Sequence, residues 1–151
     1  NPATQVIPQA KELQKMAKLL EKGKVTILCG HGCAGAHDEL MQLCETLKAP
    51  MVHALRGKEH VEYNNPYDVG MTGFIGFSSG YYAIEDCDTL LMLGTNFPYR
   101  QFYPSKAQII QVDIDGAAIG RRCAVDLGVI GGIKETITAS ISWLKKVLKP
   151  I

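Results

Sequence analysis

The sequence has no long hydrophobic run, no excess of either charge and no C-x-x-C pair of cysteines. Its longest apolar runs, such as Thr89–Leu93, are far shorter than the ~20 residues of a membrane-spanning helix. Sixteen basic and 15 acidic residues give a formal net charge of +1, without a basic block that would indicate a nucleic-acid or anionic-membrane surface. Residues 1–10 lack a signal-peptide pattern and an initiator Met, so we expect a processed chain or an excised piece.

The spacing of cysteines and histidines offers little for a metal. Five cysteines are present but no C-x-x-C pair, and neither a second pair nor a nearby histidine completes a zinc site with Cys29 and Cys33. The four histidines show no H-x-x-x-H or H-E-x-x-H spacing. We therefore expect small buried thiols in a reducing cytosol, and no metal site.

What the chain does have is enough apolar sequence for one packed domain. Of its 151 residues, 46% are hydrophobic and 21% are charged. Short apolar runs predict five strands, at Val25–Cys29, Met51–Leu55, Thr89–Leu93, Gln108–Val112 and Leu127–Ile130. Helical periodicity and capping predict helices at 8–22, 36–48, 78–86 and 133–148, with a short helical turn at 117–120.

Apolar strands that alternate with helices are typical of a parallel sheet covered on both faces. We therefore predict a three-layer α/β/α domain with a mainly parallel, Rossmann-like sheet of five or six strands. Residues 56–77 and 94–107 read as long irregular loops, and loops of this length inside a compact domain are usually functional or disordered.

The first candidate site follows the first predicted strand, where residues 30–35 fit the pattern G-x-G-x-x-G. Glycines at this spacing let the backbone turn tightly and bring N–H groups against a ligand phosphate, although a tight turn without a ligand would look the same. The nicotinamide version of this motif needs an acid at the end of the second strand, where the chain has Arg56. A helix also precedes the first strand, so a nicotinamide cofactor is disfavoured.

Further loops end at the same predicted edge of the sheet. Glycine clusters occupy residues 70–76 and 94–100, and Asp113 follows the fourth strand. An open α/β sheet binds its ligands at the carboxyl ends of its strands, so these loops suit one long ligand with phosphates. Arg56 and Arg100 would neutralise a pyrophosphate, and Asp113 would accept hydrogen bonds from an adenine amino group or ribose hydroxyls. No nucleophile–base pair and no G-x-S-x-G pattern is present.

Four strings carry a resemblance to a known family: residues 29–37, 53–63, 65–80 and 94–104. They closely resemble the pyruvate oxidase family of thiamine-diphosphate enzymes, which is related to acetolactate synthase. The match runs from about Ala10 to about Leu148 and is similar to the central, FAD-binding domain of three. The resemblance implies one FAD-binding central domain over residues 1–151. The flanking domains, which hold thiamine diphosphate and Mg²⁺, are absent from this chain.

The resemblance also implies which residues contact FAD. Asp113 and Ile114 would hold the adenosine end, with Asp126 and Leu127 nearby. His31 departs from the smaller residue of close relatives. The full set lies on the glycine loops and strand ends: Gly30, His31, Gly32, Leu55, Arg56, Gly70, Met71, Thr72, Gly73, Phe74, Ile75, Gly94, Thr95, Asn96, Phe97, Pro98, Tyr99, Arg100, Asp113, Ile114, Asp126 and Leu127.

As the family implies, the parent enzyme would decarboxylate pyruvate oxidatively and pass electrons through FAD to a quinone or oxygen. The isolated domain would be inactive, and the parent would be a cytoplasmic homotetramer with no transmembrane segment, no nucleic-acid partner and an optional peripheral membrane contact. An acetolactate-synthase-like parent with structural FAD is the first alternative, although the strings at 97–100 and 53–58 favour the oxidase. A stand-alone nucleotide-binding module is the second alternative.

Overall fold

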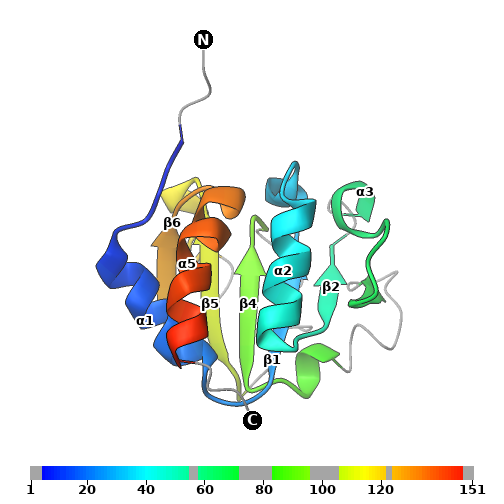
Figure 1. Ribbon diagram of the computed structural model, residues 1–151, viewed down its shortest axis with the longest axis horizontal. Helices are drawn as coiled ribbons and strands as arrows, with labels where there is room; N and C mark the ends of the chain where they lie inside the picture. Colours follow the sequence, from blue (N-terminus) through cyan, green and yellow to red (C-terminus); the bar gives the residue numbers. More distant parts are fainter. Residues whose placement is uncertain (1–4, 55–57, 72–82, 96–105, 122–123, 148–151) are drawn as a thin grey trace.

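The computed structural model describes residues 5–54, 58–71, 83–95, 106–121 and 124–147. These residues form a six-stranded sheet in the order β3-β2-β1-β4-β5-β6, in which every neighbouring pair is parallel. Three long helices, α1, α2 and α5, lie over one face of the sheet (Figure 1). The predicted α/β class with a parallel, Rossmann-like sheet is confirmed.

The bounds of the elements are as follows. The strands are β1 Val25–Cys29, β2 Met51–His53, β3 Asp68–Met71, β4 Thr89–Leu93, β5 Gln108–Asp113 and β6 Leu127–Ile130. The helices are α1 Ala10–Leu20, α2 His37–Leu47, α3 Lys58–Val61 and α5 Ile133–Val147, with 3-10 turns η1 His31–Cys33 and η4 Gly116–Ala118.

The central strands β1 and β4 explain why the core needs two faces. All ten of their residues are buried, and they pair in register from Val25↔Thr89 to Cys29↔Leu93. Because side chains alternate along a strand, one half enters the cluster beneath α1, α2 and α5. The other half, with Leu28 and Met92 among them, packs on the opposite face with Ile84 and Cys87. These strands are apolar along their whole length because both faces of the sheet are covered.

Two elements lie where the sequence predicts an irregular loop. Strand β3 extends the sheet at its edge, and α3 joins it to β2 through a turn in which Asn65 accepts from the Tyr67 N–H at 2.9 Å. The Met51 N–H donates to the Tyr67 carbonyl at 2.9 Å, which continues the pairing of β2 with this segment. Of the helix predicted at 78–86, residues 83–85 are helical and the part before residue 83 lies outside the described residues.

Other predicted bounds shift by a few residues. The first helix begins at Ala10 rather than residue 8, the second strand ends at His53 rather than residue 55, and the predicted turn at 117–120 forms as η4. Among the described helices, none combines the length and hydropathy that crossing a bilayer requires.

Four cysteines, Cys29, Cys33, Cys44 and Cys87, are buried and free, as the sequence predicts, and Cys123 lies outside the described residues. Burial raises the pKa of the Cys44 thiol to about 12 and that of Cys87 to about 11. Burial, reinforced by Cys33, also raises the pKa of Cys29 well above its usual range. Because the thiolate is the reactive form, these thiols are poor nucleophiles and poor metal ligands in the folded protein.

We expect iodoacetamide to alkylate Cys44 at least about a thousandfold more slowly in the folded protein than in urea at pH ~8, because the thiolate is so rare when the pKa is about 12. The rate should rise about tenfold per pH unit, since each unit increases the thiolate fraction tenfold. Peptide mapping by mass spectrometry gives the rate at each cysteine. Rapid labelling of Cys44 in the folded protein would contradict this assignment.

Candidate functional site

The candidate site lies where the strand order reverses. From β1 the chain moves outward to β2 and β3, and β4 then returns to the other side of β1. Such a switch point leaves neighbouring carboxyl ends whose loops diverge, and open α/β sheets bind ligands there. The loops after β1 and β4 meet at this point: the Gly30 N–H donates to the Leu93 carbonyl at 3.1 Å, and the Gly32 N–H donates to the Gly94 carbonyl at 2.9 Å.

The close contact between these two loops explains why glycine occupies positions 30 and 32, even without a ligand. A Cβ on Gly30 would stand 2.5 Å from the Cβ of Thr95, and one on Gly32 would stand 2.6 Å from the Cα of Gly94. The expectation that Gly30 and Gly32 offer their N–H groups to a phosphate is therefore corrected, because both donate to backbone carbonyls. Any contact that these two residues make with a cofactor stays a prediction.

A cavity of about 410 Å³ opens at this edge. Its walls come from the loops after β1, β4, β5 and β6 and from the start of α5: Gly32, Ala34, Gly35, Gly94, Asp113, Ile114, Gly132, Ile133, Lys134 and Glu135. Four of the residues that the sequence singles out, Gly32, Gly94, Asp113 and Ile114, are brought together here. Sequence reasoning missed the contribution of α5, because no motif marks the residues 132–135.

A buried glutamine holds two of these loops in place. The Gln111 side chain, on β5, donates to the Thr95 carbonyl at 3.3 Å and to the Ala118 carbonyl at 3.1 Å, and its oxygen accepts from the Gly120 N–H at 2.9 Å. Every polar group of the amide is thus engaged, which fixes the loop after β4 against the turn after β5. Thr95 is itself buried and packs on Gly30.

Asp113 ends β5 and lines the cavity. The carboxylate accepts from the Asp115 N–H at 2.9 Å, and the Asp113 carbonyl accepts from the Gly131 N–H at 3.0 Å. Since a carboxylate has about four lone-pair sites, it can accept further hydrogen bonds from a ligand. The neighbouring Ile114 is 58% exposed and offers an apolar surface beside it.

Asp126 and Leu127 lie elsewhere. They stand at the amino end of β6, where Leu127 pairs with Ile110 and the Asp126 carboxylate accepts from the Ile109 N–H at 2.7 Å. Along β5, the level of Leu127 is three residues, or roughly 10 Å, from Asp113, and that of Asp126 is four residues, or roughly 13 Å. Neither residue lies beside Asp113, and their contact with the adenosine end stays a prediction.

The remaining predicted contacts lie at the end of β3 or outside the described residues. Gly70 and Met71 form the end of β3, so this glycine cluster begins within a strand rather than a loop. The others lie outside the described residues: Leu55, Arg56, Thr72, Gly73, Phe74, Ile75, Asn96, Phe97, Pro98, Tyr99 and Arg100.

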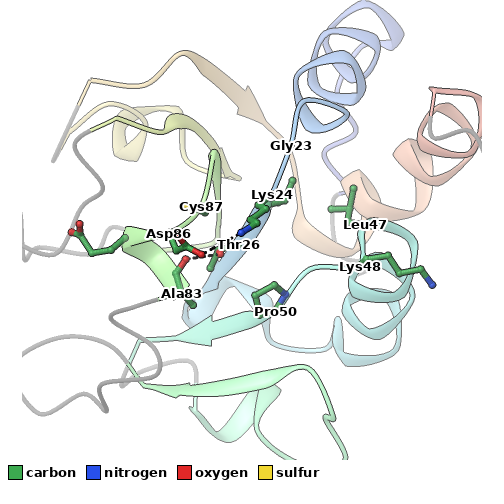
Figure 2. A pocket seen from close by; sticks show the side chains of 11 residues that line it. Gly23, Lys24, Thr26, Leu47, Lys48, Pro50, Ala83, Asp86 and Cys87 are labelled. Atoms are coloured by element: carbon green, nitrogen blue, oxygen red, sulfur yellow. Dashed lines mark hydrogen bonds and ion pairs between the residues drawn. The ribbon is translucent and has the colours of Figure 1, made fainter. Parts of the chain in front are cut away.

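A larger cavity, of about 860 Å³, opens at the opposite, amino edge of the sheet (Figure 2). Lys24, Thr26 and Asp86 line one side of it, and Lys48 and Pro50 line the other. An exposed ion pair of 3.4 Å between Lys24 and Asp86 borders it, and such pairs contribute little to stability. None of the predicted cofactor residues lines this cavity, so its size does not make it the candidate site.

A second polar cluster ties the edge strand to the sheet. His53, on β2, is buried, and its Nδ1 lies 2.9 Å from the Asp68 carboxylate on β3. Its Nε2 lies 3.5 Å from the Glu62 carboxylate, just after α3. One ligand atom of each residue lies within 4.8 Å of the other two, but the histidine meets the two acids with opposite ring nitrogens, so each acid has its own contact with the ring. We assign this cluster a structural role.

The strand order and the gathered loops define a Rossmann-like α/β domain. The family model described as thiamine pyrophosphate enzyme, central domain, matches residues 13–140. The chain therefore belongs to the family of thiamine pyrophosphate enzyme central domains.

Similar proteins agree with this assignment. An uncharacterized 42.6 kDa protein from the isoamylase 3' region of Pseudomonas amyloderamosa is 62% identical over 93% of this chain and 36% of its own length. YdaP of Bacillus subtilis (strain 168), provisionally named as containing thiamine pyrophosphate, is 38% identical over 82% of this chain and 22% of its own. A provisionally named acetolactate synthase large subunit of Methanocaldococcus jannaschii is 34% identical over 83% of this chain and 23% of its own.

A solved structure shares the fold. The X-ray structure of a provisionally assigned thiamin diphosphate-dependent enzyme from Mycobacterium smegmatis matches all of this chain and 31% of its own, with a TM-score of 0.80 and 18% identity. The chain thus spans between 22% and 36% of the length of the curated relatives described above.

Proposed function

We propose that this domain binds FAD along the carboxyl edge of its sheet, with the adenosine end in the 410 Å³ cavity beside Asp113. The observation that carries the proposal is the convergence of four loops, after β1, β4, β5 and β6, on that one cavity. Since ligand pockets span about 300–1,000 Å³, the cavity suits part of an extended dinucleotide.

The residues of the cavity fit a nucleotide. Its glycine walls at Gly32, Gly94 and Gly132 bring backbone close to the space, and Asp113 can accept from ribose hydroxyls or an adenine amino group. Helix α5 begins at the cavity, and the positive end of its dipole favours an anion. Glu135 in the same first turn opposes that effect, so we expect sugar and base here and the pyrophosphate farther along the edge.

We further propose that the parent is a pyruvate-oxidase-like, homotetrameric enzyme whose flanking domains hold thiamine diphosphate and Mg²⁺. When bound, FAD supplies a two-electron acceptor, from which a quinone or oxygen is reduced. The role of this chain is to hold and orient that cofactor toward the thiamine site, and it contributes no catalytic residue of its own. The free, buried cysteines support a reducing, cytoplasmic compartment.

Flavin titration tests the site. The protein should bind FAD and become yellow, with an absorption band near ~450 nm. Asp113→Asn should weaken FAD binding about tenfold, because it removes a charge-assisted hydrogen-bond acceptor. Asp86→Asn, at the opposite edge beside the larger cavity, is the matched control and should leave the dissociation constant unchanged. Wild-type affinity in Asp113→Asn, measured by flavin fluorescence, would argue against this placement, and absence of flavin binding would reject the cofactor.

The second candidate function is an acetolactate-synthase-like parent in which FAD is structural. It is favoured by relatives that carry this name, such as the Methanocaldococcus jannaschii protein. The intact parent enzyme separates the two candidates under anaerobic conditions with pyruvate. Bleaching of the flavin absorbance indicates the oxidase, whereas acetolactate formation with an unchanged flavin spectrum indicates the synthase.

A further inference from the structure

Three side chains that could bind a metal ion meet beside the loop after β1. His31 comes from η1, and Glu59 and His60 come from α3, so the cluster joins segments that are 28 and 29 positions apart. One potential ligand atom of each residue lies within 4.8 Å of the other two. His60 Nε2 lies 3.3 Å from His31 Nδ1 and 3.5 Å from Glu59 Oε1. A single nitrogen of His60 thus faces both of the other groups.

These separations match the edges of a metal coordination tetrahedron. With metal–nitrogen bonds of about 2.0–2.1 Å and metal–oxygen bonds of about 2.0–2.2 Å, ligand atoms in tetrahedral zinc sites stand about 3.3–3.5 Å apart. The two distances from His60 Nε2, 3.3 and 3.5 Å, fall in this range, and the third separation is within 4.8 Å. The two rings meet edge to face, at an interplanar angle of 63° and a centroid distance of 5.1 Å, so they are not stacked on each other.

We propose that His31, Glu59 and His60 form a binding site for a divalent transition-metal ion of the zinc class. Two imidazoles with one carboxylate are a ligand set that Zn²⁺ accepts, and a fourth position stays open to water or another ligand. The exposed position of His31 and the 78% exposure of the Glu59 side chain give an ion direct access, while the His60 side chain is only 20% exposed and anchors the site.

The alternative for the same geometry is a hydrogen bond from one imidazole N–H to the other ring nitrogen. That bond accounts for the two histidines but gives Glu59 no role. The other histidine–carboxylate cluster, His53 with Glu62 and Asp68, also brings one ligand atom of each residue within 4.8 Å of the other two. There the buried histidine contacts Asp68 through Nδ1 and Glu62 through Nε2, so each acid has its own ring nitrogen. The convergence on one nitrogen of His60 therefore favours the first cluster as the metal site.

A bound ion would clamp α3 to η1. It would fasten the segment after β2 to the loop after β1, at the same edge as the cavity beside Asp113 but with side chains that do not line that cavity. The cluster shares His31 with the predicted FAD contacts, so the metal is titrated without FAD present.

The experiment titrates Zn²⁺ alone into the metal-free protein by calorimetry near neutral pH. A Cys123→Ser background removes the cysteine that lies outside the described residues. We expect one Zn²⁺ per chain, with the affinity at least about tenfold weaker in His31→Asn, His60→Asn and Glu59→Gln, because each change removes a ligand. Co²⁺ in place of Zn²⁺ should give the intense visible absorption of a four-coordinate site.

Glu62→Gln is the matched control, because it alters a neighbouring carboxylate that faces His53 instead. It should keep wild-type zinc affinity. A wild-type protein that takes up no Zn²⁺ would overturn the proposal, as would undiminished affinity in His31→Asn. Loss of affinity in Glu62→Gln with none in Glu59→Gln would also overturn it, by moving the ion to the His53 cluster. Should His60→Asn fail to fold, the exposed His31 variant decides the matter alone.

Discussion

Replacing Gly94 by alanine is expected to lower the free energy of unfolding by about 3 kcal/mol. Gly94 has φ +60°, and a Cβ there would stand 2.5 Å from the Cα of Gly32 and 2.7 Å from its carbonyl carbon. Because backbone atoms cannot swing aside as a flexible side chain would, the loops after β1 and β4 must separate. Overpacking of this kind costs about 1–3 kcal/mol, and a left-handed backbone adds about 1–2 kcal/mol for a residue with a Cβ.

Gly35→Ala is the matched control for this prediction. Gly35 has φ +78°, but a Cβ built on it meets nothing within 4 Å among the described atoms. It should therefore cost only the backbone strain, about 1 kcal/mol. Urea denaturation followed by circular dichroism gives both values. Equal losses in the two variants would show that strain alone acts, and that the contact between the two loops is not tight in solution.

The same glycines show what a motif can and cannot predict. The spacing of Gly30 and Gly32 after an apolar strand correctly predicts a strand–turn–helix unit, because only a residue without a Cβ fits that turn. The pattern does not reveal what the Cβ would strike. Here the obstacle is the backbone of Gly94 and the side chain of Thr95, some 60 residues away, so the close partner is the protein itself.

Whether a strand can be predicted from the sequence also depends on how deeply the strand is buried. Thr89–Leu93 is recognised easily, because all five of its residues are buried between two layers. The sequence Asp68–Met71 is not, because it contains an acid and a glycine, both rare in strands. An edge strand needs less apolar surface than a central one, and Asp68 is satisfied by His53 from the neighbouring strand. That partner is invisible in the local sequence.

The histidines show most clearly which contacts the spacing of residues in the sequence cannot predict. The sequence predicts no metal site, since the four histidines lack the spacing of a local motif. The fold nevertheless brings His31 within 3.3 Å of His60, because η1 follows β1 and α3 follows the adjacent strand β2. Parallel neighbouring strands place their carboxyl-end loops together, whatever the number of residues between them. Ligands on such loops are adjacent in space with no fixed sequence spacing.

Replacing Asp68 by leucine is expected to cost about 2–3 kcal/mol and to loosen the edge of the sheet. The Asp68 side chain is 12% exposed and its carboxylate lies 2.9 Å from Nδ1 of His53, whose side chain is only 3% exposed. Leucine removes the acceptor and leaves a buried ring nitrogen without it, and an unsatisfied buried polar group costs about 1–3 kcal/mol, more when charge is involved. Urea denaturation measures the loss, and hydrogen exchange at residues 68–71 locates it.

Asp68→Asn separates the lost hydrogen bond from the lost shape. Asparagine keeps an oxygen that can accept from the His53 Nδ1–H, so it should lose less than about 1 kcal/mol. Glu62→Gln should lose still less, since the Glu62 carboxylate is 46% exposed and stands 3.5 Å from the other ring nitrogen. Asp68→Leu therefore costs most because it loses a buried hydrogen bond, Asp68→Asn costs less because it keeps that bond, and Glu62→Gln costs least because Glu62 is more exposed. If Asp68→Leu instead matched the wild type in both denaturation and exchange, the histidine would not depend on this acid, and β3 would be held by its backbone pairing with β2.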